Sequence, residues 1–369
     1  MAADVMRRRP GARIRVAVLA ALIAPAAQVA ALIAPAAQVA ALIAPAAQAV
    51  AAVPVVDRVR AAGALACGVV AELTDWDRDD HHSGLDDFNA EWCKAVAVAV
   101  LGDAARVNRI GFGAEAEGLA ALHRGAVDVL MTVSPTASAA ARYRVRFGPP
   151  VFHDSLAILV PAAAGLRRLA DLDGKVLCLL TDDGRLRRIR AAARRRGITL
   201  RYMLHQEEGE MDAALVVGRC QAMLADLSVL ADDRAGFHAK AGDYVFLPER
   251  LSLDPVAPAY RDDDPAWGRI VDWTVAALIQ AEASGVTRAN VGSMRGTGDA
   301  DIERLTGEDF ATAQALGLPR DWSAQVIAAL GNYGEIYRRT LGEGSPLGLP
   351  RGLNALWTNG GLIYPLPGR

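Results

Sequence analysis

The sequence predicts an α/β fold of two lobes joined by two crossing strands, and three observations support this prediction. Short apolar segments alternate with helical segments, which is typical of parallel sheets covered by helices. The alternation occurs in two separate blocks of the chain, and long helical segments follow the second block. A chain that leaves one lobe and returns to it crosses between the lobes twice, and two such crossings form a hinge.

The composition indicates a folded protein without a strong global charge. The 369 residues are 52% hydrophobic and 22% charged, and the formal net charge is -2. This amount of apolar material is sufficient for one large or two medium cores. A nearly neutral chain has no general attraction for nucleic acid or anionic lipid, so a charged partner has to be recognised at a local site.

The N-terminal segment differs from the rest of the chain. Five arginines lie within the first fifteen residues, and the run 16–56 that follows carries no charge. Inside this run the decamer ALIAPAAQVA begins at Ala21, recurs at Ala31 and returns nearly intact at Ala41. We interpret residues 1–49 as a cleavable signal peptide with decamer repeats, which predicts a periplasmic protein. A membrane anchor is the alternative, since the run exceeds the roughly 20 residues that span a bilayer.

The first α/β block follows this leader. An apolar run after Gly63 predicts a buried strand, and the next helical segment has a wide apolar face. The predicted elements alternate strand, helix, strand, helix and strand, at residues 66–70, 91–101, 106–112, 114–124 and 126–132. We assign residues 50–158 to the first part of lobe I.

The second block repeats the alternation and forms lobe II, residues 159–254. Its predicted elements are again strand, helix, strand, helix and strand, at residues 175–180, 185–196, 200–204, 211–218 and 222–225. The first helix of the block carries seven arginines. No aromatic residues interleave with them, so we interpret this helix as a solvated surface and expect no nucleic-acid partner.

Residues 255–369 are predicted to return to lobe I and to end in a C-terminal extension. Segments 245–248 and 256–260 are extended, and Asp264 with Pro265 predicts the start of a helix. The apolar residues of that helix recur at helical spacing, which indicates that it docks on a lobe.

Four cysteines remain in a chain that carries an export signal. An even number of cysteines in an oxidising compartment indicates two disulfides. Their placement favours pairing between neighbours, Cys67 with Cys93 and Cys178 with Cys220. Their spacing does not fit a zinc site, and we predict no metal centre there.

Several stretches resemble the periplasmic general L-amino-acid-binding proteins, which belong to the polar amino-acid receptors of ABC transporters. The matching stretches are GALACGVV (63–70), EWCKAVAVAVLGD (91–103), GAVDVL (125–130), GRCQAMLADLSVLADDR (218–234), LPERLSLDPVAPAYRDDDPAW (247–267), AEASGVTRANV (281–291), GNYGEIYRRTLG (331–342) and RGLNALWTNGGLIYPLPGR (351–369). The resemblance covers essentially the whole mature chain, and all four cysteines fall where the family has them.

The resemblance implies a type II periplasmic-binding-protein clamp that captures a small polar ligand, such as an amino acid, by lobe closure. Such a protein hands its ligand to an ABC-transporter permease. It is a monomer without a cofactor and it is not an enzyme. A rival interpretation is a repurposed homologue that binds a ligand other than an amino acid, a metal ion or a periplasmic partner.

The resemblance assigns ligand contacts to lobe I. Trp76 occupies the place of an aromatic side chain against which the family's ligand lies. The family's carboxylate-binding arginine falls on Ala141 when residues are counted back from Phe147, so only the neighbouring Arg142 can substitute for it. Ser134 and Thr136 are the expected hydroxyl partners of the ligand.

The resemblance also assigns contacts to lobe II. The family binds the ligand carboxylate at a Gly-Thr-Thr turn that opens a helix, where free N–H groups favour an anion. This chain has Asp182 and Asp183 at that point, and fixed negative charges there would repel a carboxylate. Helix capping by Asp183 is the structural alternative. Asp226 matches the acid that receives the ligand ammonium.

Two other features of the sequence could carry separate functions. The sequence DWDRDDHH at residues 75–82 combines carboxylates with imidazoles, which are metal-ligand types, but it lacks the glycine and terminal glutamate of an EF-hand loop. We interpret it as an acidic loop at the mouth of the cleft and leave metal binding open. His153 is isolated on the predicted crossing strand, so no catalytic constellation is evident.

Overall fold

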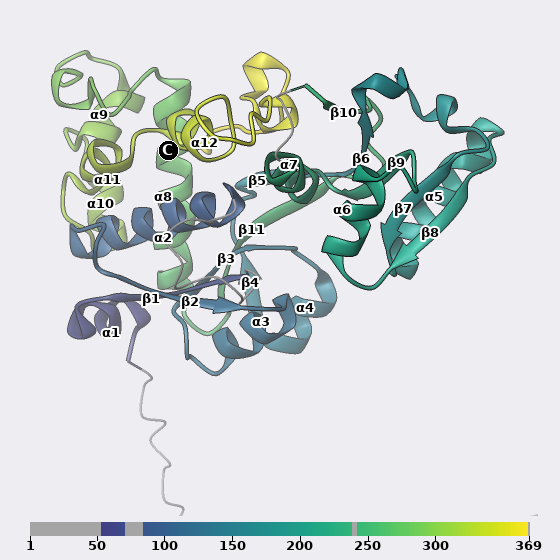
Figure 1. The fold of residues 1–369 in the computed structure, drawn as a ribbon. Coiled ribbons are helices and arrows are strands. Elements are labelled where there is room, and N and C mark those ends of the chain that lie inside the picture. The colour runs from purple at the N-terminus through teal and green to yellow at the C-terminus, as the bar shows by residue number, and fades with distance from the viewer. Residues whose placement is uncertain (1–52, 71–83, 238–241, 368–369) are drawn as a thin grey trace, which may run out of the picture. The chain divides into compact units, whose positions relative to one another are not determined.

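Two β-sheets organise the protein (Figure 1). The structure is a computed structural model that describes residues 53–70, 84–237 and 242–367. In the first sheet the strand order is β2-β1-β3-β11-β4, and β5 also pairs with β11. In the second sheet the order is β10-β6-β9-β7-β8. The predicted α/β class with two sheets is confirmed.

The first sheet contains the elements predicted for the first block. Its strands are β1 (Leu65–Val70), β2 (Val107–Phe112), β3 (Val129–Val133), β4 (Val145–Phe147), β5 (Phe152–Asp154) and β11 (Asp254–Arg261). Its helices are α1 (Val55–Ala62), α2 (Gly84–Leu101), α3 (Glu115–His123) and α4 (Ala137–Tyr143). Strand β1 pairs in parallel with β2 and β3, whereas β11 pairs antiparallel with β3, β4 and β5. Helices connect the parallel strands, as such pairing requires.

Close packing of α3 on this sheet depends on two glycines. A Cβ at Gly68 of β1 would lie 2.8 Å from Cδ1 of Leu130, and a Cβ at Gly118 of α3 would lie 2.9 Å from the same atom. Both distances are too short for any larger residue without movement of Leu130. The absence of a side chain at these positions therefore lets the helix approach the strands.

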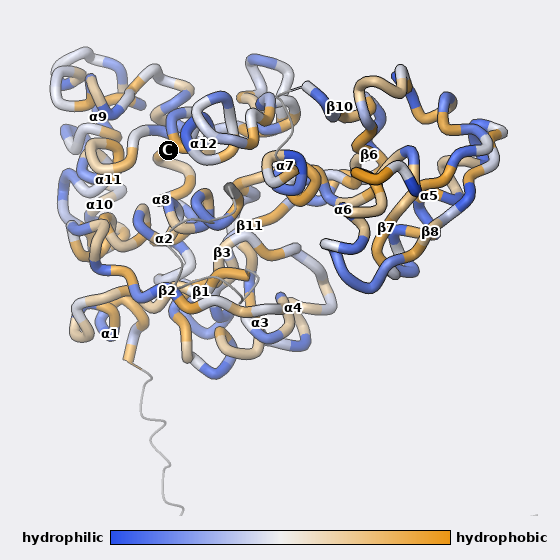
Figure 2. The backbone as a smooth tube through the Cα atoms, in the orientation of Figure 1, coloured by the Kyte–Doolittle hydropathy of each residue, from blue (hydrophilic) through white to orange (hydrophobic). Residues whose placement is uncertain are grey.

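The second sheet is covered by helices on both faces. Its strands are β6 (Leu156–Pro161), β7 (Val176–Leu180), β8 (Arg201–His205), β9 (Ala222–Asp226) and β10 (Tyr244–Phe246), and its helices are α5 (Asp183–Arg196), α6 (Glu208–Val216) and α7 (Leu227–Gly236). Leu156 and Ile158 of β6 belong to one apolar cluster, and Ala157 and Leu159 belong to the other. This period of two marks a strand that is buried on both faces, and β6 is correspondingly apolar in Figure 2.

Helix α5 illustrates how the sequence pattern produces local structure. Ile189, Ala192 and Ala193 are buried on its inner face. The seven arginines lie at other positions of the helix, and most of their side chains are exposed. The helix ends at Gly197, whose φ of 66° lies in the left-handed region that glycine adopts readily.

The C-terminal part of the chain packs against α2 and the first sheet. Its helices are α8 (Pro265–Ala283), α9 (Ala300–Thr306), α10 (Ala311–Leu316), α11 (Trp322–Leu330) and α12 (Tyr333–Thr340), and short 3-10 helices occur at Ala162–Ala164, Leu169–Leu172, Val291–Ser293, Gly352–Asn354 and Trp357–Asn359. Helix α8 begins at the predicted place, because the Asp264 side chain accepts the N–H of Trp267 and Pro265 follows the cap. The indole of Trp267 donates to the carbonyl of Asp128 at 2.8 Å.

The C-terminal extension contacts the strand that leads out of the first sheet. The side chain of Asn354 accepts the N–H of His153 at 2.6 Å and donates to its carbonyl at 3.2 Å. Arg351 forms two hydrogen bonds with the carboxylate of Glu282, at 3.0 and 3.1 Å. The extension is therefore held by specific polar contacts.

Both predicted disulfides are confirmed. Cys67 of β1 is bonded to Cys93 of α2, and Cys178 of β7 is bonded to Cys220 immediately before β9. Each bond ties a strand to a neighbouring segment of its own block.

Two predictions concern parts of the chain that lie outside the described residues. These are the signal peptide at residues 1–49 and the acidic segment 75–82, which includes Trp76. Within the described ranges, none of the helices has the length and apolarity needed to span a membrane.

Candidate functional site

A pocket of about 400 Å³ lies where the chain crosses between the two sheets. It receives residues from the segment after β3, from both crossings, and from the carboxyl ends of β7 and β9. Its lining residues are Ser134, Pro135, Thr136, Asp154, Leu156, Asp182, Gly184, Arg185, Arg188, Asp226, Ser252, Asp254, Pro255 and Val256. Ligands of open α/β sheets bind in such crevices at the carboxyl ends of strands, so this pocket is the candidate binding site.

The sheet topology brings two acidic side chains to the same edge of the second sheet. Strands β7 and β9 are parallel neighbours, so Asp182 after β7 and Asp226 at the end of β9 lie at one edge. Asp182 is the N-cap of α5, and its Oδ1 accepts the backbone N–H of Arg185 at 2.8 Å. This hydrogen bond lowers the pKa of Asp182 and keeps its carboxylate ionised.

An ion pair connects α5 with the end of β9. A guanidinium nitrogen of Arg185 lies 2.7 Å from Oδ2 of Asp226. Both side chains are partly exposed to the pocket, at 25% and 35% respectively. A cation and an anion are thus presented side by side, and each retains further hydrogen-bonding capacity for a ligand.

Asp154, at the end of β5, is the most deeply buried acid of the pocket. Its carboxylate accepts the backbone N–H of Ser155 at 2.7 Å and the hydroxyl of Ser228 at 2.5 Å. Burial raises the pKa of Asp154 to about 6, and the nearby charge of Asp226 adds to this increase. The ionised form of Asp154 is therefore costly unless a cation lies nearby.

A second group of polar residues joins the two crossings. The hydroxyl of Ser252 accepts the backbone N–H of Leu156 at 2.8 Å and donates to the carboxylate of Asp254. Arg188 of α5 lies 3.6 Å from Asp254. Helix α5 is thus linked to the strand that returns to the first sheet.

The first sheet contributes hydroxyl groups. Thr136 is the N-cap of α4, and its Oγ1 accepts the backbone N–H of Ala139 at 3.2 Å. Ser134 gives hydrogen bonds from its backbone and its side chain to Glu115, whose pKa is nevertheless raised because burial outweighs these bonds. Thr132 precedes this segment with a φ of 49°, a strained value for a residue other than glycine that recurs at functional sites.

The structure brings together four of the site residues that the sequence indicates: Ser134, Thr136, Asp182 and Asp226 all line the pocket. Arg142 does not line it; this arginine is exposed in the last turn of α4, and its guanidinium lies 5.4 Å from the ring centre of Tyr143. Trp76 lies outside the described residues.

The residue that caps α5 is not Asp183, the capping residue that the sequence suggested. Asp182, not Asp183, caps the helix, because the backbone of Asp182 is still extended while Asp183 is already helical. Asp183 is exposed and does not line the pocket.

Several lining residues were missed by the sequence analysis: Asp154, Arg185, Arg188, Ser252 and Asp254. The spacing of Arg185 and Arg188 was an available signal, since residues three apart share a helix face. The other three lie on or beside the crossings. In the described part of the chain, no group of three His, Cys, Asp or Glu side chains could hold a metal ion.

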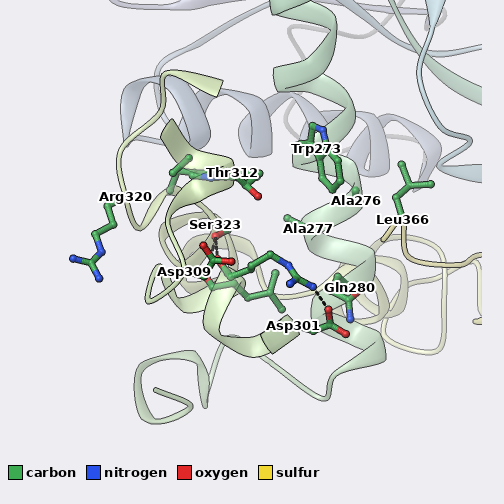
Figure 3. A pocket seen from close by; sticks show the side chains of 14 residues that line it. Trp273, Ala276, Ala277, Gln280, Asp301, Asp309, Thr312, Arg320, Ser323 and Leu366 are labelled. Carbon is green, nitrogen blue, oxygen red and sulfur yellow. Dashed lines mark hydrogen bonds and ion pairs between the residues drawn. The ribbon is translucent and has the colours of Figure 1, made fainter. Parts of the chain in front are cut away.

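A different pocket, shown in Figure 3, lies among α8, α9, α10 and α11. Trp273, Leu305 and Leu366 contribute to its apolar wall, and Asp301 is paired with Arg304 beside it. Its cavity volume is about 40 Å³, which has room for a few water molecules but not for an amino acid. It is therefore a packing defect between helices rather than a ligand site.

Two α/β sheets that are linked by paired crossings, with a polar pocket between the linked segments, define a solute-binding protein of the clamp type.

No family model matches the chain. Full-length comparisons nevertheless find clear relatives. The general L-amino acid-binding periplasmic protein AapJ of Rhizobium johnstonii is 36% identical over 316 residues, which cover 84% of this chain and 92% of AapJ.

Two further relatives agree. The glutamate/glutamine/aspartate/asparagine-binding protein BztA of Rhodobacter capsulatus is 34% identical, over 85% of this chain and 93% of its own. A solved structure of an ABC-transporter periplasmic binding protein from Brucella ovis, with glutathione bound, has a TM-score of 0.73 and 33% identity, and the match covers 86% of this chain and 100% of that one. The chain therefore belongs to the family of periplasmic amino-acid-binding proteins of ABC transporters, whose members bind solutes and are not enzymes.

Proposed function

We propose that this chain is an exported solute-binding protein of an ABC uptake system, which captures a small polar ligand bearing an amino group. The observation that carries this proposal is the pocket between the linked sheets, where Asp226 and Arg185 are presented together. Asp226 is the proposed acceptor of the ligand ammonium. Ser134 and Thr136 supply hydroxyl contacts from the opposite side of the pocket.

The proposal includes the division of the chain and its route of export. Residues 1–49 act as a cleavable signal, and the mature chain works as a monomer in the periplasm. Residues 50–158 and 255–369 form lobe I with the C-terminal extension, and residues 159–254 form lobe II. Closure of the lobes around the ligand produces the form that the permease recognises. The ordered crossings beside Asp154 and Asp254 support a hinge at this place.

Trp76 and Arg142 remain proposed ligand contacts, although neither is among the described residues that line the pocket. Trp76 would stack against the ligand, and Arg142 would reach its carboxylate only if the segment around α4 moved. The names of the relatives widen the set of candidate ligands to neutral and acidic amino acids and glutathione.

A ligand screen tests the function. Thermal-shift measurements with amino acids, glutathione, polyamines and metal ions should identify a small amine-bearing compound that raises the melting temperature. Asp226→Asn should then weaken binding of that compound by about tenfold or more in calorimetry, because its ammonium loses a charged partner. Asp183→Asn, an exposed neighbour outside the pocket, should leave affinity unchanged. Absence of stabilisation by the whole panel, or full affinity in Asp226→Asn, would refute the proposal.

A further inference from the structure

The backbone N–H groups at the start of α5 that could bind a ligand carboxylate are already used by the protein. The backbone N–H of Arg185 donates to the carboxylate of Asp182 at 2.8 Å, and Gly184 contributes a second backbone hydrogen bond to the same acid. Free N–H groups at the start of a helix attract anions. Here the attraction is satisfied internally, and an arriving carboxylate would meet the fixed negative charge of Asp182.

The first sheet shows the same arrangement. Ser134 gives both its backbone and its side-chain hydrogen bonds to the carboxylate of Glu115. The hydroxyl oxygen of Thr136 accepts the N–H of Ala139. Both hydrogen-bond donors of Ser134 are therefore engaged, the hydroxyl of Thr136 lies 3.3 Å from that of Ser138, and Arg142 does not line the pocket.

The two guanidinium groups of the pocket also have acidic partners. Arg185 is paired with Asp226 at 2.7 Å, and Arg188 lies 3.6 Å from Asp254. Among the described residues, four carboxylates and two guanidinium groups line the pocket. A zwitterion would leave this excess of negative charge unchanged, whereas a cation would reduce it.

The excess negative charge of the pocket lies in part on the carboxylate of Asp154. It is 8% exposed, and its direct hydrogen bonds come from Ser155 and Ser228, which are neutral. Arg250 lies within electrostatic range, but its guanidinium donates to the carbonyl of Leu247. Burial and the charge of Asp226 hold the pKa of Asp154 above its usual range, as expected for a buried acid without a directly hydrogen-bonded cation.

We infer that this pocket takes a small organic amine without a carboxylate, such as an α,ω-diamine, with one ammonium held between Asp154 and Asp226. The inference rests on the proposed function and narrows its ligand class. Arg185 then acts as an internal competitor of the ligand. Its guanidinium pairs with Asp226 in the ligand-free protein, and the ligand ammonium displaces it.

A matched pair of ligands tests this inference directly. Putrescine and L-ornithine differ only by the carboxylate of ornithine. Calorimetric titration of the purified protein at neutral pH should give an affinity for putrescine at least about tenfold higher than for ornithine. An affinity for ornithine, glutamine or glutathione that exceeds that for putrescine would overturn the inference while leaving the solute-binding function intact. Absence of binding by every compound would overturn both.

A variant of Arg185 provides a second test, in which the direction of the change in ligand affinity decides the outcome. Arg185→Gln removes the internal competitor for Asp226, so diamine affinity should rise several-fold. If Arg185 instead gripped a ligand carboxylate, the same variant would lose affinity for amino acids by about tenfold, and the inference would be wrong. Arg187→Gln is the matched control, because this exposed residue on the same helix does not line the pocket.

A second variant covers the case in which Arg185→Gln is poorly folded. Asp182→Asn retains a side-chain oxygen that can cap α5 while it removes one negative charge from the pocket. Diamine affinity should fall several-fold and the ratio of putrescine to ornithine affinity should decrease. An unchanged ratio would contradict the account, because the fixed charge of Asp182 would then have no influence on ligand choice.

Discussion

The buried carboxyl group of Asp154 should give the protein an unusual dependence of stability on pH. Its pKa rises from 3.8 to about 6 on folding, mainly because burial disfavours the charged form. A difference of about two units corresponds to about 3 kcal/mol, since each unit is worth about 1.4 kcal/mol. The folded protein binds the proton more tightly, so this contribution to the free energy of unfolding is fully present below about pH 4 and is lost as the pH rises through about 6.

The comparison of wild type with Asp154→Asn isolates this effect. Burial also raises the pKa values of Asp212 and Asp272 to about 6, so the wild type alone would report several groups together. These residues are unchanged in the variant, and their contribution cancels in the difference. Chemical denaturation of both proteins between about pH 4 and pH 7 should show the variant gaining up to about 3 kcal/mol relative to wild type as the pH rises. A stability difference that is independent of pH would show that the pKa of Asp154 is not raised on folding.

Further predictions concern one disulfide and the space around two glycines. Replacement of Cys178 and Cys220 by serine should cost about 4 kcal/mol in denaturation, because the bond spans 42 residues and restricts the unfolded chain; a loss below about 1 kcal/mol would contradict this. Gly268→Ala should cost about 1–3 kcal/mol, since its Cβ would lie 2.4 Å from the ring of Tyr260. Gly209→Ala in α6, where nothing lies within 4 Å, should instead gain about 0.5–1 kcal/mol; equal effects of the two changes would count against the packing described.

The arrangement of strands and helices could be predicted well from the sequence because the core strands are continuous apolar runs. Segments such as 176–180 and 222–225 are apolar, are flanked by polar turns and alternate with helices. The start of α8 was equally readable, because Asp264 and Pro265 form a local cap whose chemistry does not depend on distant residues. Local patterns of this kind determine elements and their order.

The site was predicted only in part because its chemistry depends on distant contacts. Asp182 and Asp226 follow strands, and strand ends of a parallel sheet meet at one edge, so both were within reach of sequence reasoning. Arg185 could not be singled out from the sequence, because it is one of seven arginines in the same helix. Asp154 looks like an ordinary acid in the sequence, and only its burial next to Asp226 distinguishes it.

A crystal structure of the protein with the ligand that stabilises it most would show directly whether the pocket between the two sheets is the binding site. We expect a ligand between the two linked sheets, with its ammonium within hydrogen-bonding distance of Asp226 and with further contacts from Ser134 or Thr136. A ligand bound elsewhere, or one that contacts residues of a single sheet only, would show that this pocket is not the binding site.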